Sequence, residues 1–215
     1  ASTLPQAGPI ALQGTAGVGP GSRVAVNGAG GGSGSLAVQL AKAAGAHVTA
    51  VDNAGKLDFL RSLGADAVVD HRVEDVTRLG PFDLVLDLVA HRSVRDYRRA
   101  LAPGGRYLAV GGSVSTMLSL LTAGTVLGRV SGRRLGVLAV KPGPDHFIPL
   151  EARCASGEVR IHIDREVSLD EVPEALEPSL APVLFGLFER FPGADDDWCF
   201  TVLHTLESLD NHEAE

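Results

Sequence analysis

The chain has 215 residues, of which 45% are hydrophobic and 21% are charged, and it carries a formal net charge of −7. These values are typical of a globular protein with one large domain, or one domain and an appendage. No apolar run is long enough to span a bilayer, the N-terminus has no signal-peptide pattern, and Cys154 and Cys199 match no metal or redox spacing. We therefore expect a cytoplasmic protein with no membrane partner.

The negative charge lies at the end of the sequence. Residues 191–215 contain seven Asp and Glu residues and no Lys or Arg, which leaves residues 1–190 neutral. A neutral body gives no electrostatic basis for binding nucleic acid.

The first 21 residues are rich in Pro, Gly, Ala and Gln, and predict only a short helical turn near residues 10–12. A β-branched run over residues 23–27 follows. It passes into five glycines within seven residues, and then into an apolar pattern of helical period over residues 33–44. This order predicts a first strand, a phosphate-binding turn and the first helix of a nucleotide-binding βαβ unit. The turn consists of Gly28, Ala29, Gly30, Gly31, Gly32, Ser33 and Gly34.

The spacing of the glycines is a variant of the dinucleotide-binding pattern. A strict G-x-G-x-x-G would require glycine at position 33, where the chain has Ser33, so Ala29-x-Gly31-x-x-Gly34 is the pattern that fits. We expect backbone N–H groups of this turn to approach a pyrophosphate, and Gly34 to allow close packing of helix and sheet. A second strand over residues 48–51 ends in Asp52, where an acid can reach the adenosine ribose.

Strands and helices alternate along the rest of the chain. Strands are predicted at 67–69, 83–89, 106–110, 134–140 and 159–163, and helices at 56–63, 93–101, 117–127 and 144–155. This alternation predicts an α/β fold with a doubly wound parallel sheet, of the Rossmann type, over residues 1–177. A ligand should bind at the carboxyl ends of the strands.

Several of these segments together resemble the cofactor domain of medium-chain dehydrogenases/reductases, and the nearest branch resembles the zinc-independent quinone oxidoreductases. The resemblance is carried by Leu4-Pro5-Gln6-Ala7-Gly8, Arg23-Val24-Ala25-Val26-Asn27-Gly28-Ala29, Val38-Gln39-Leu40-Ala41-Lys42, Leu63-Gly64-Ala65-Asp66, Asp87-Leu88-Val89 and Leu101-Ala102-Pro103-Gly104-Gly105-Arg106.

The resemblance implies an NAD(P)H cofactor and hydride transfer to a quinone or an α,β-unsaturated carbonyl. By matching positions, Gly31, Gly32 and Gly34 would contact the pyrophosphate. The segment from Asp52 through Asn53 to Lys56 would lie at the adenosine ribose, and Val89, Gly111 and Gly112 beside the nicotinamide. No catalytic residue is assigned. The family branch mostly uses NADPH, but a carboxylate at Asp52 repels a 2′-phosphate, so the residues themselves favour NADH modestly.

Two departures from the family pattern affect this interpretation. Family members carry a barrel-like substrate domain ahead of the position where this sequence starts, so the chain is expected to be mainly a cofactor-binding module. Beyond Glu177 the sequence continues into an acidic, helix-patterned tail over residues 178–215. The tail could form a hairpin that packs on the domain or on the second subunit of a homodimer. It could equally be a non-native end, from a fusion or a shifted reading frame.

Other candidate sites are weaker. Arg92, Arg95, Arg98 and Arg99 fall on one side of a predicted helix, and a solvated helix face explains them better than a basic patch. The histidines, among them His71, His91, His146 and His162, show no metal-ligand spacing, so we expect no metal site. Two alternative functions remain open: a non-catalytic module that senses NAD(P)H, and a methyltransferase that uses S-adenosylmethionine.

Overall fold

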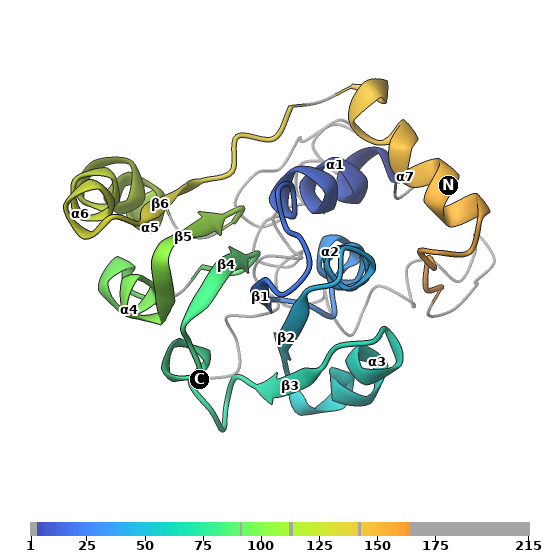
Figure 1. Cartoon of the computed structure of the whole chain (residues 1–215), viewed down its shortest axis with the longest axis horizontal. Helices are drawn as coiled ribbons and strands as arrows, with labels where there is room; N and C mark the ends of the chain where they lie inside the picture. The colour runs from blue at the N-terminus through green and yellow to red at the C-terminus, as the bar shows by residue number, and fades with distance from the viewer. Residues whose placement is uncertain (1–3, 91, 112–113, 142, 164–215) are drawn as a thin grey trace, which may run out of the picture. The chain divides into compact units, whose positions relative to one another are not determined.

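The computed structural model describes residues 4–90, 92–111, 114–141 and 143–163. Contacts divide the chain into two units, residues 1–161 and 162–215, and the fold described here is that of the first. Within it, six parallel strands form one sheet in the order β3-β2-β1-β4-β5-β6 (Figure 1). The strands are β1 (Arg23–Asn27), β2 (His47–Asp52), β3 (Ala67–Asp70), β4 (Phe82–Asp87), β5 (Leu101–Ala109) and β6 (Arg134–Val137).

Helices cover both faces of this sheet, which confirms the predicted doubly wound α/β fold. They are α1 (Leu4–Gly14), α2 (Gly32–Ala43), α3 (Leu57–Ser62), α4 (Val94–Ala100), α5 (Val114–Ser119), α6 (Thr125–Ser131) and α7 (Ile148–Ala155). Shorter segments are the 3₁₀ turns η1 (Ala54–Lys56), η2 (Val76–Arg78) and η4 (Pro144–His146), and the π-helical η3 (Leu120–Gly124). Figure 1 shows α1, α2 and α7 on one side of the sheet and α4, α5 and α6 on the other.

The two layers of helices enclose two separate apolar cores, because successive residues of a strand point to opposite faces. In β1, Val24 and Val26 pack in one core with α2 residues such as Leu40. Ala25 lies in the other core, which also contains Tyr97 of α4 and Tyr107 of β5. The strand order reverses between β1 and β4, so the switch point of the fold lies at the carboxyl ends of these two strands.

The structure differs from the sequence-based expectation in several elements. The first helix runs from Leu4 to Gly14 instead of forming one turn, because Leu4, Ala7 and Ala11 are buried in the core shared with α2. Strand β5 begins at Leu101, which pairs with Phe82 before a register shift, and it therefore includes the Pro-Gly-Gly segment that was expected to precede it. Strand β4 ends at residue 87, β6 ends at residue 137 and not at 140, and residues 159–163 form no strand. The single helix expected at 117–127 is the consecutive series α5, η3 and α6.

Two glutamine side chains, one on each of the first two helices, form hydrogen bonds with segments that follow β6. Gln13 of α1 donates to the carbonyl of Lys141 at 3.0 Å and accepts from its N–H at 2.9 Å. Gln39 of α2 forms the same pair of bonds with Arg160, at 2.9 and 2.7 Å. These are the two-point hydrogen bonds that an amide side chain makes with a single backbone residue.

Part of the sequence-based interpretation lies outside the described residues. This applies to the boundary at residues 177–178 and to the acidic tail. No described helix has the length and apolar character needed to cross a membrane.

Candidate functional site

The predicted site residues that the structure describes lie at the carboxyl ends of four neighbouring strands. The glycine turn (residues 28–34) joins β1 to α2, Asp52 ends β2, and Asn53 and Lys56 follow it. Val89 follows β4 and Gly111 follows β5, whereas Gly112 is outside the described residues. The topology therefore brings the predicted set to the switch point.

The glycine turn is anchored to the neighbouring strand. The N–H groups of Gly28 and Ala29 both donate to the carbonyl of Val51, at 3.1 and 3.0 Å. Gly28 has φ of +77°, a conformation that glycine adopts without steric cost. The N-cap residue of α2 is the extended Gly31, which provides no side-chain cap. Its first N–H groups are thus presented without a capping side chain, as an anion site requires.

The glycines of the turn have different roles in the fold. A Cβ on Gly34 would lie 2.3 Å from the carbonyl oxygen of Gly28, so this position requires glycine for helix–strand packing. A Cβ on Gly28 would lie 2.8 Å from Cγ2 of Val89. At Gly31 the nearest atom would be 3.5 Å away, and at Gly32 it would be 3.8 Å away. The fold therefore has room for a Cβ at Gly31 and Gly32, and a bound ligand is a separate reason for glycine there.

Asp52 closes the turn from the side of β2. Its carboxylate accepts hydrogen bonds from the N–H of Gly30 at 2.7 Å and from the N–H of Asn53 at 2.9 Å. The half-exposed Lys56 ammonium lies 3.8 Å from the same carboxylate, which is itself 8% exposed. Since each carboxylate oxygen can accept two hydrogen bonds, Asp52 keeps acceptor capacity beyond these contacts.

A second turn, residues 88–90, leaves β4 on the other side of the switch point; we call it the exit turn. Leu88 donates to the carbonyl of Asn27 at 3.0 Å, which joins the exit turn to β1. A Cβ on Gly111 would lie 3.0 Å from the carbonyl oxygen of Leu88. The exit turn therefore lies between the glycine turn, which Val89 contacts, and the end of β5, which Leu88 contacts.

Sequence analysis missed a buried polar cluster beneath this turn. Asp87 is fully buried and accepts four hydrogen bonds, from Asn27 Nδ2 at 2.8 Å, Tyr107 Oη at 2.9 Å, Val89 N at 3.1 Å and Ala90 N at 2.8 Å. The only signal in the sequence is a carboxylate that ends an otherwise apolar strand. An acid at this position is equally typical of an ordinary turn residue.

Tyr97 and Tyr107 complete the cluster. Their rings are stacked with centroids 4.2 Å apart, and both are 1% exposed. Burial, and then the charge of Asp87, raise the pKa of both hydroxyls far above the usual range, so both remain protonated. Among the described residues, the Tyr97 hydroxyl has no hydrogen-bond partner, whereas the Tyr107 hydroxyl donates to Asp87.

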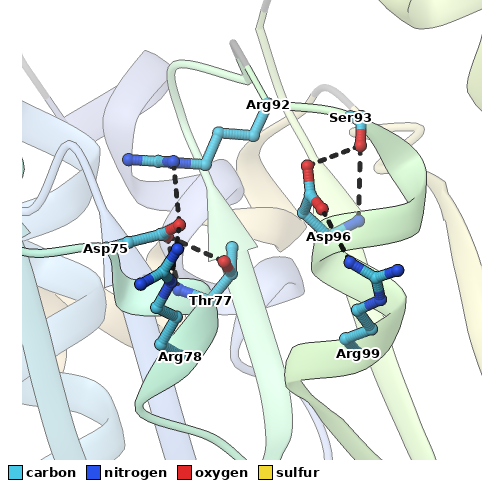
Figure 2. Close-up of polar contacts among 7 residues, drawn as sticks. All are labelled: Asp75, Thr77, Arg78, Arg92, Ser93, Asp96 and Arg99. Atoms are coloured by element: carbon cyan, nitrogen blue, oxygen red, sulfur yellow. Dashed lines mark hydrogen bonds and ion pairs between the residues drawn. The ribbon is translucent and has the colours of Figure 1, made fainter.

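Two of the four arginines expected on one side of the helix, Arg92 and Arg99, are paired with acids. Figure 2 shows Arg92 reaching Asp75, at 3.1 Å, and Arg99 directed toward Asp96 of its own helix, at 3.6 Å. Burial alone would raise the pKa of Asp75. Hydrogen bonds from Thr77 and the nearby arginines outweigh burial, and the pKa is lowered. The exposed Arg95 and Arg99 are consistent with a solvated helix face, whereas the Nε atom of Arg98 is buried and has no hydrogen-bond partner among the described residues.

No group of three or more His, Cys, Asp or Glu side chains that could hold a metal ion occurs within the described ranges. Tyr97 and Tyr107, the two tyrosines of the chain, are both used in the buried cluster.

Known proteins are similar to this chain in both sequence and architecture. The family model for zinc-binding dehydrogenases matches residues 32–142. A zinc-type alcohol dehydrogenase-like protein of Schizosaccharomyces pombe is 29% identical over 175 residues, which covers 79% of this chain and 46% of that protein. A chloroplastic quinone oxidoreductase of Triphysaria versicolor is 29% identical over 167 residues, which covers 75% of this chain and 50% of that protein.

Among solved structures, the quinone oxidoreductase from Coxiella burnetii superimposes with a TM-score of 0.71 at 28% identity. The match covers 83% of this chain and 56% of that one. The chain spans about half the length of the curated relatives that it matches.

Proposed function

Since this chain belongs to the zinc-binding dehydrogenase family, within the medium-chain dehydrogenases/reductases, we propose that it is the cofactor-binding part of an NAD(P)H-dependent oxidoreductase. We propose further that the substrate is a quinone or an α,β-unsaturated carbonyl. The observation that carries the proposal is the glycine turn at the switch point, with Asp52 bonded to its backbone at Gly30.

The residues at this site fit a dinucleotide. The uncapped N-terminus of α2 and the open positions at Gly31 and Gly32 suit a diphosphate that approaches the backbone closely. Asp52 lies at the end of the next strand, where the adenosine ribose would bind, and Lys56 lies beside it. Val89 and Gly111 would flank the nicotinamide half.

The cofactor and the protein would contribute different parts of the reaction. When bound, the nicotinamide supplies the hydride. The residues of this chain would bind the diphosphate at the glycine turn, orient the ribose through Asp52, and fix the position of the ring through the exit turn. Their contribution is orientation and electrostatics, and no described residue is assigned as an acid or a base.

Two finer features belong to the same proposal. We propose that NADH binds more tightly than NADPH, because the Asp52 carboxylate is held by the backbone and repels a 2′-phosphate. We also propose that the activity of this protein requires no zinc. Elemental analysis of the purified protein tests the second point, and stoichiometric zinc would overturn it.

The experiment that tests the function is a titration of the full chain with NADH and NADPH, followed by an assay of quinone-dependent NADH oxidation. We expect saturable binding and oxidation that depends on the quinone. Binding without oxidation would favour the alternative of a non-catalytic module that senses NAD(P)H. Failure to bind either nucleotide, together with binding of S-adenosylmethionine, would favour the methyltransferase alternative. Light scattering of the same sample tests whether the protein forms a homodimer.

A further inference from the structure

We propose that Asp87 is a positioning residue for the nicotinamide half of the site: its buried carboxylate fixes the exit turn, and with it Val89, against the glycine turn. The inference rests on the proposed function, because it assigns a role within the same dinucleotide site.

A single oxygen of Asp87 joins two strand ends. Oδ1 accepts from Val89 N and Ala90 N of the exit turn and also from Asn27 Nδ2, at the last residue of β1. Oδ2 accepts from the Tyr107 hydroxyl of β5. The two oxygens therefore have separate tasks, since one holds the turn and the other faces the buried tyrosine pair.

The exit turn depends on this contact. Ala90 has φ of +51°, which is unfavourable for a residue with a Cβ, and it is 1% exposed. Its N–H donates to Asp87 at 2.8 Å, so the hydrogen bond helps to hold a conformation that alanine does not prefer. Without an acceptor at residue 87, two N–H groups of the turn would lose their partner. Buried unpaired donors are costly, so the turn would shift toward solvent.

Such a shift would change the site at one particular place. A Cβ on Gly28 would lie only 2.8 Å from Cγ2 of Val89. The Val89 side chain is therefore packed tightly against the glycine turn. The adenosine half is held separately, by Asp52 and its contact with Gly30. Loss of the Asp87 contacts should therefore weaken the binding of ligands that reach the nicotinamide half. The binding of ligands that occupy only the adenosine and diphosphate half should not change.

The test compares NADH with ADP as probes on the full chain. We expect Asp87→Ala to weaken NADH binding about tenfold, the size associated with losing two hydrogen bonds, and to leave ADP binding within about twofold. A merely structural role would lower the folded fraction and leave the ratio of the two affinities unchanged. An unchanged ratio in folded Asp87→Ala protein would overturn the inference.

Two matched variants separate the tasks of the two oxygens. Asp87→Asn keeps an oxygen for the exit turn and offers an N–H to the Tyr107 hydroxyl, so we expect the NADH affinity to be largely retained. Tyr107→Phe removes only the partner of Oδ2, so the NADH/ADP affinity ratio should stay near the wild-type value. A loss of NADH binding in Tyr107→Phe as large as in Asp87→Ala would contradict the assignment to Oδ1.

Hydrogen exchange provides a test that does not depend on the folding of a variant. In the wild-type chain, the amides of Val89 and Ala90 should exchange as slowly as strand amides, because each donates to a buried carboxylate. Rapid exchange at both positions would overturn the inference. If the wild-type chain binds neither NADH nor NADPH, the proposed function fails, while the exchange measurement still reports on the exit turn.

Discussion

The Asp52 carboxylate accepts a hydrogen bond from the backbone N–H of Gly30 at 2.7 Å. This contact joins the acid at the end of β2 to the phosphate-binding turn after β1. Asp52 therefore has a structural task in addition to the proposed contact with the ribose, and a substitution there changes both unless it keeps an acceptor. The substitution Asp52→Ser, which shortens the side chain, would change the charge and the geometry of the turn together.

The first prediction concerns cofactor choice. Asp52→Asn retains one acceptor oxygen, which can serve the Gly30 N–H while the bond from the Asn53 N–H is lost, and it removes the negative charge, so we expect NADPH affinity to rise relative to NADH. Two unit charges about 4 Å apart interact by roughly 4 kcal/mol at an effective dielectric near 20, before screening by salt. Lys56→Met provides the opposite change, because it removes the cation that partly offsets Asp52, and it should lower NADPH affinity. Titrations with both nucleotides measure the preference. Tighter binding of NADPH by the unmodified chain would contradict the assignment.

The second prediction separates ligand binding from folding within the glycine turn. At Gly31 an added Cβ meets nothing closer than 3.5 Å, so Gly31→Val should fold normally and lose NADH binding. At Gly34 a Cβ would lie 2.3 Å from the Gly28 carbonyl oxygen, so Gly34→Ala should lower the free energy of unfolding. Urea denaturation and NADH titration of both variants measure the two effects. Normal NADH affinity in folded Gly31→Val would exclude this turn as the diphosphate site.

The third prediction concerns the two stacked tyrosines. Tyr107→Phe leaves Asp87 Oδ2 without its donor and should destabilise the fold by about 1–3 kcal/mol. Tyr97→Phe removes a buried hydroxyl with no partner among the described residues, so the free energy of unfolding should stay the same or rise. The two rings are equally buried, so each variant is the control for the other. Equal destabilisation by the two variants would be inconsistent with the hydrogen-bond assignment.

The fourth prediction concerns stability in acid. Burial alone would raise the pKa of Asp66, but hydrogen bonds from Lys42 and from the N–H of Val48, at 2.7–2.8 Å, outweigh burial and lower the pKa. A lowered folded-state pKa stabilises the fold above the unfolded-state pKa, and this contribution is lost as the pH falls through the folded-state value.

Asp66→Asn should therefore lower the free energy of unfolding at pH 7, and its difference from wild type should shrink below about pH 4. The control is Asp58→Asn, because Asp58 is 97% exposed and pairs with Arg61 on the surface, where such pairs contribute little. Denaturation at several pH values measures both variants. A constant difference between Asp66→Asn and wild type across that range would contradict the prediction.

Most of the sheet could be predicted because its strands are buried β-branched runs separated by glycine and proline. Helix α1 could not, since Pro9 and two glycines lower its helical propensity and its stability comes from contacts with α2 and α7. The early start of β5 likewise depends on pairing between Leu101 and Phe82, which no local pattern reveals.

In the candidate site, the glycine turn and Asp52 could be predicted because their spacing along the chain is itself the signal. Asp87 could not, because its role depends on donors from β1, β5 and the exit turn that lie far apart in sequence. The distinct roles of Gly31 and Gly34 also required coordinates, since only the distance to a neighbouring atom tells a packing glycine from an open one.

The glutamine contacts of α1 and α2 constrain the order in which the domain can fold. The bonds of Gln13 and Gln39 join residues 128 and 121 positions apart in the chain. During synthesis from the N-terminus, both helices leave the ribosome long before Lys141 and Arg160 are made. Contacts of such separation form only after the intervening chain is ordered. Helices α1 and α2 thus complete their packing only after Lys141 and Arg160 are ordered, and until α7 is made the part of α1 that contacts Leu150 is a surface that a chaperone could bind.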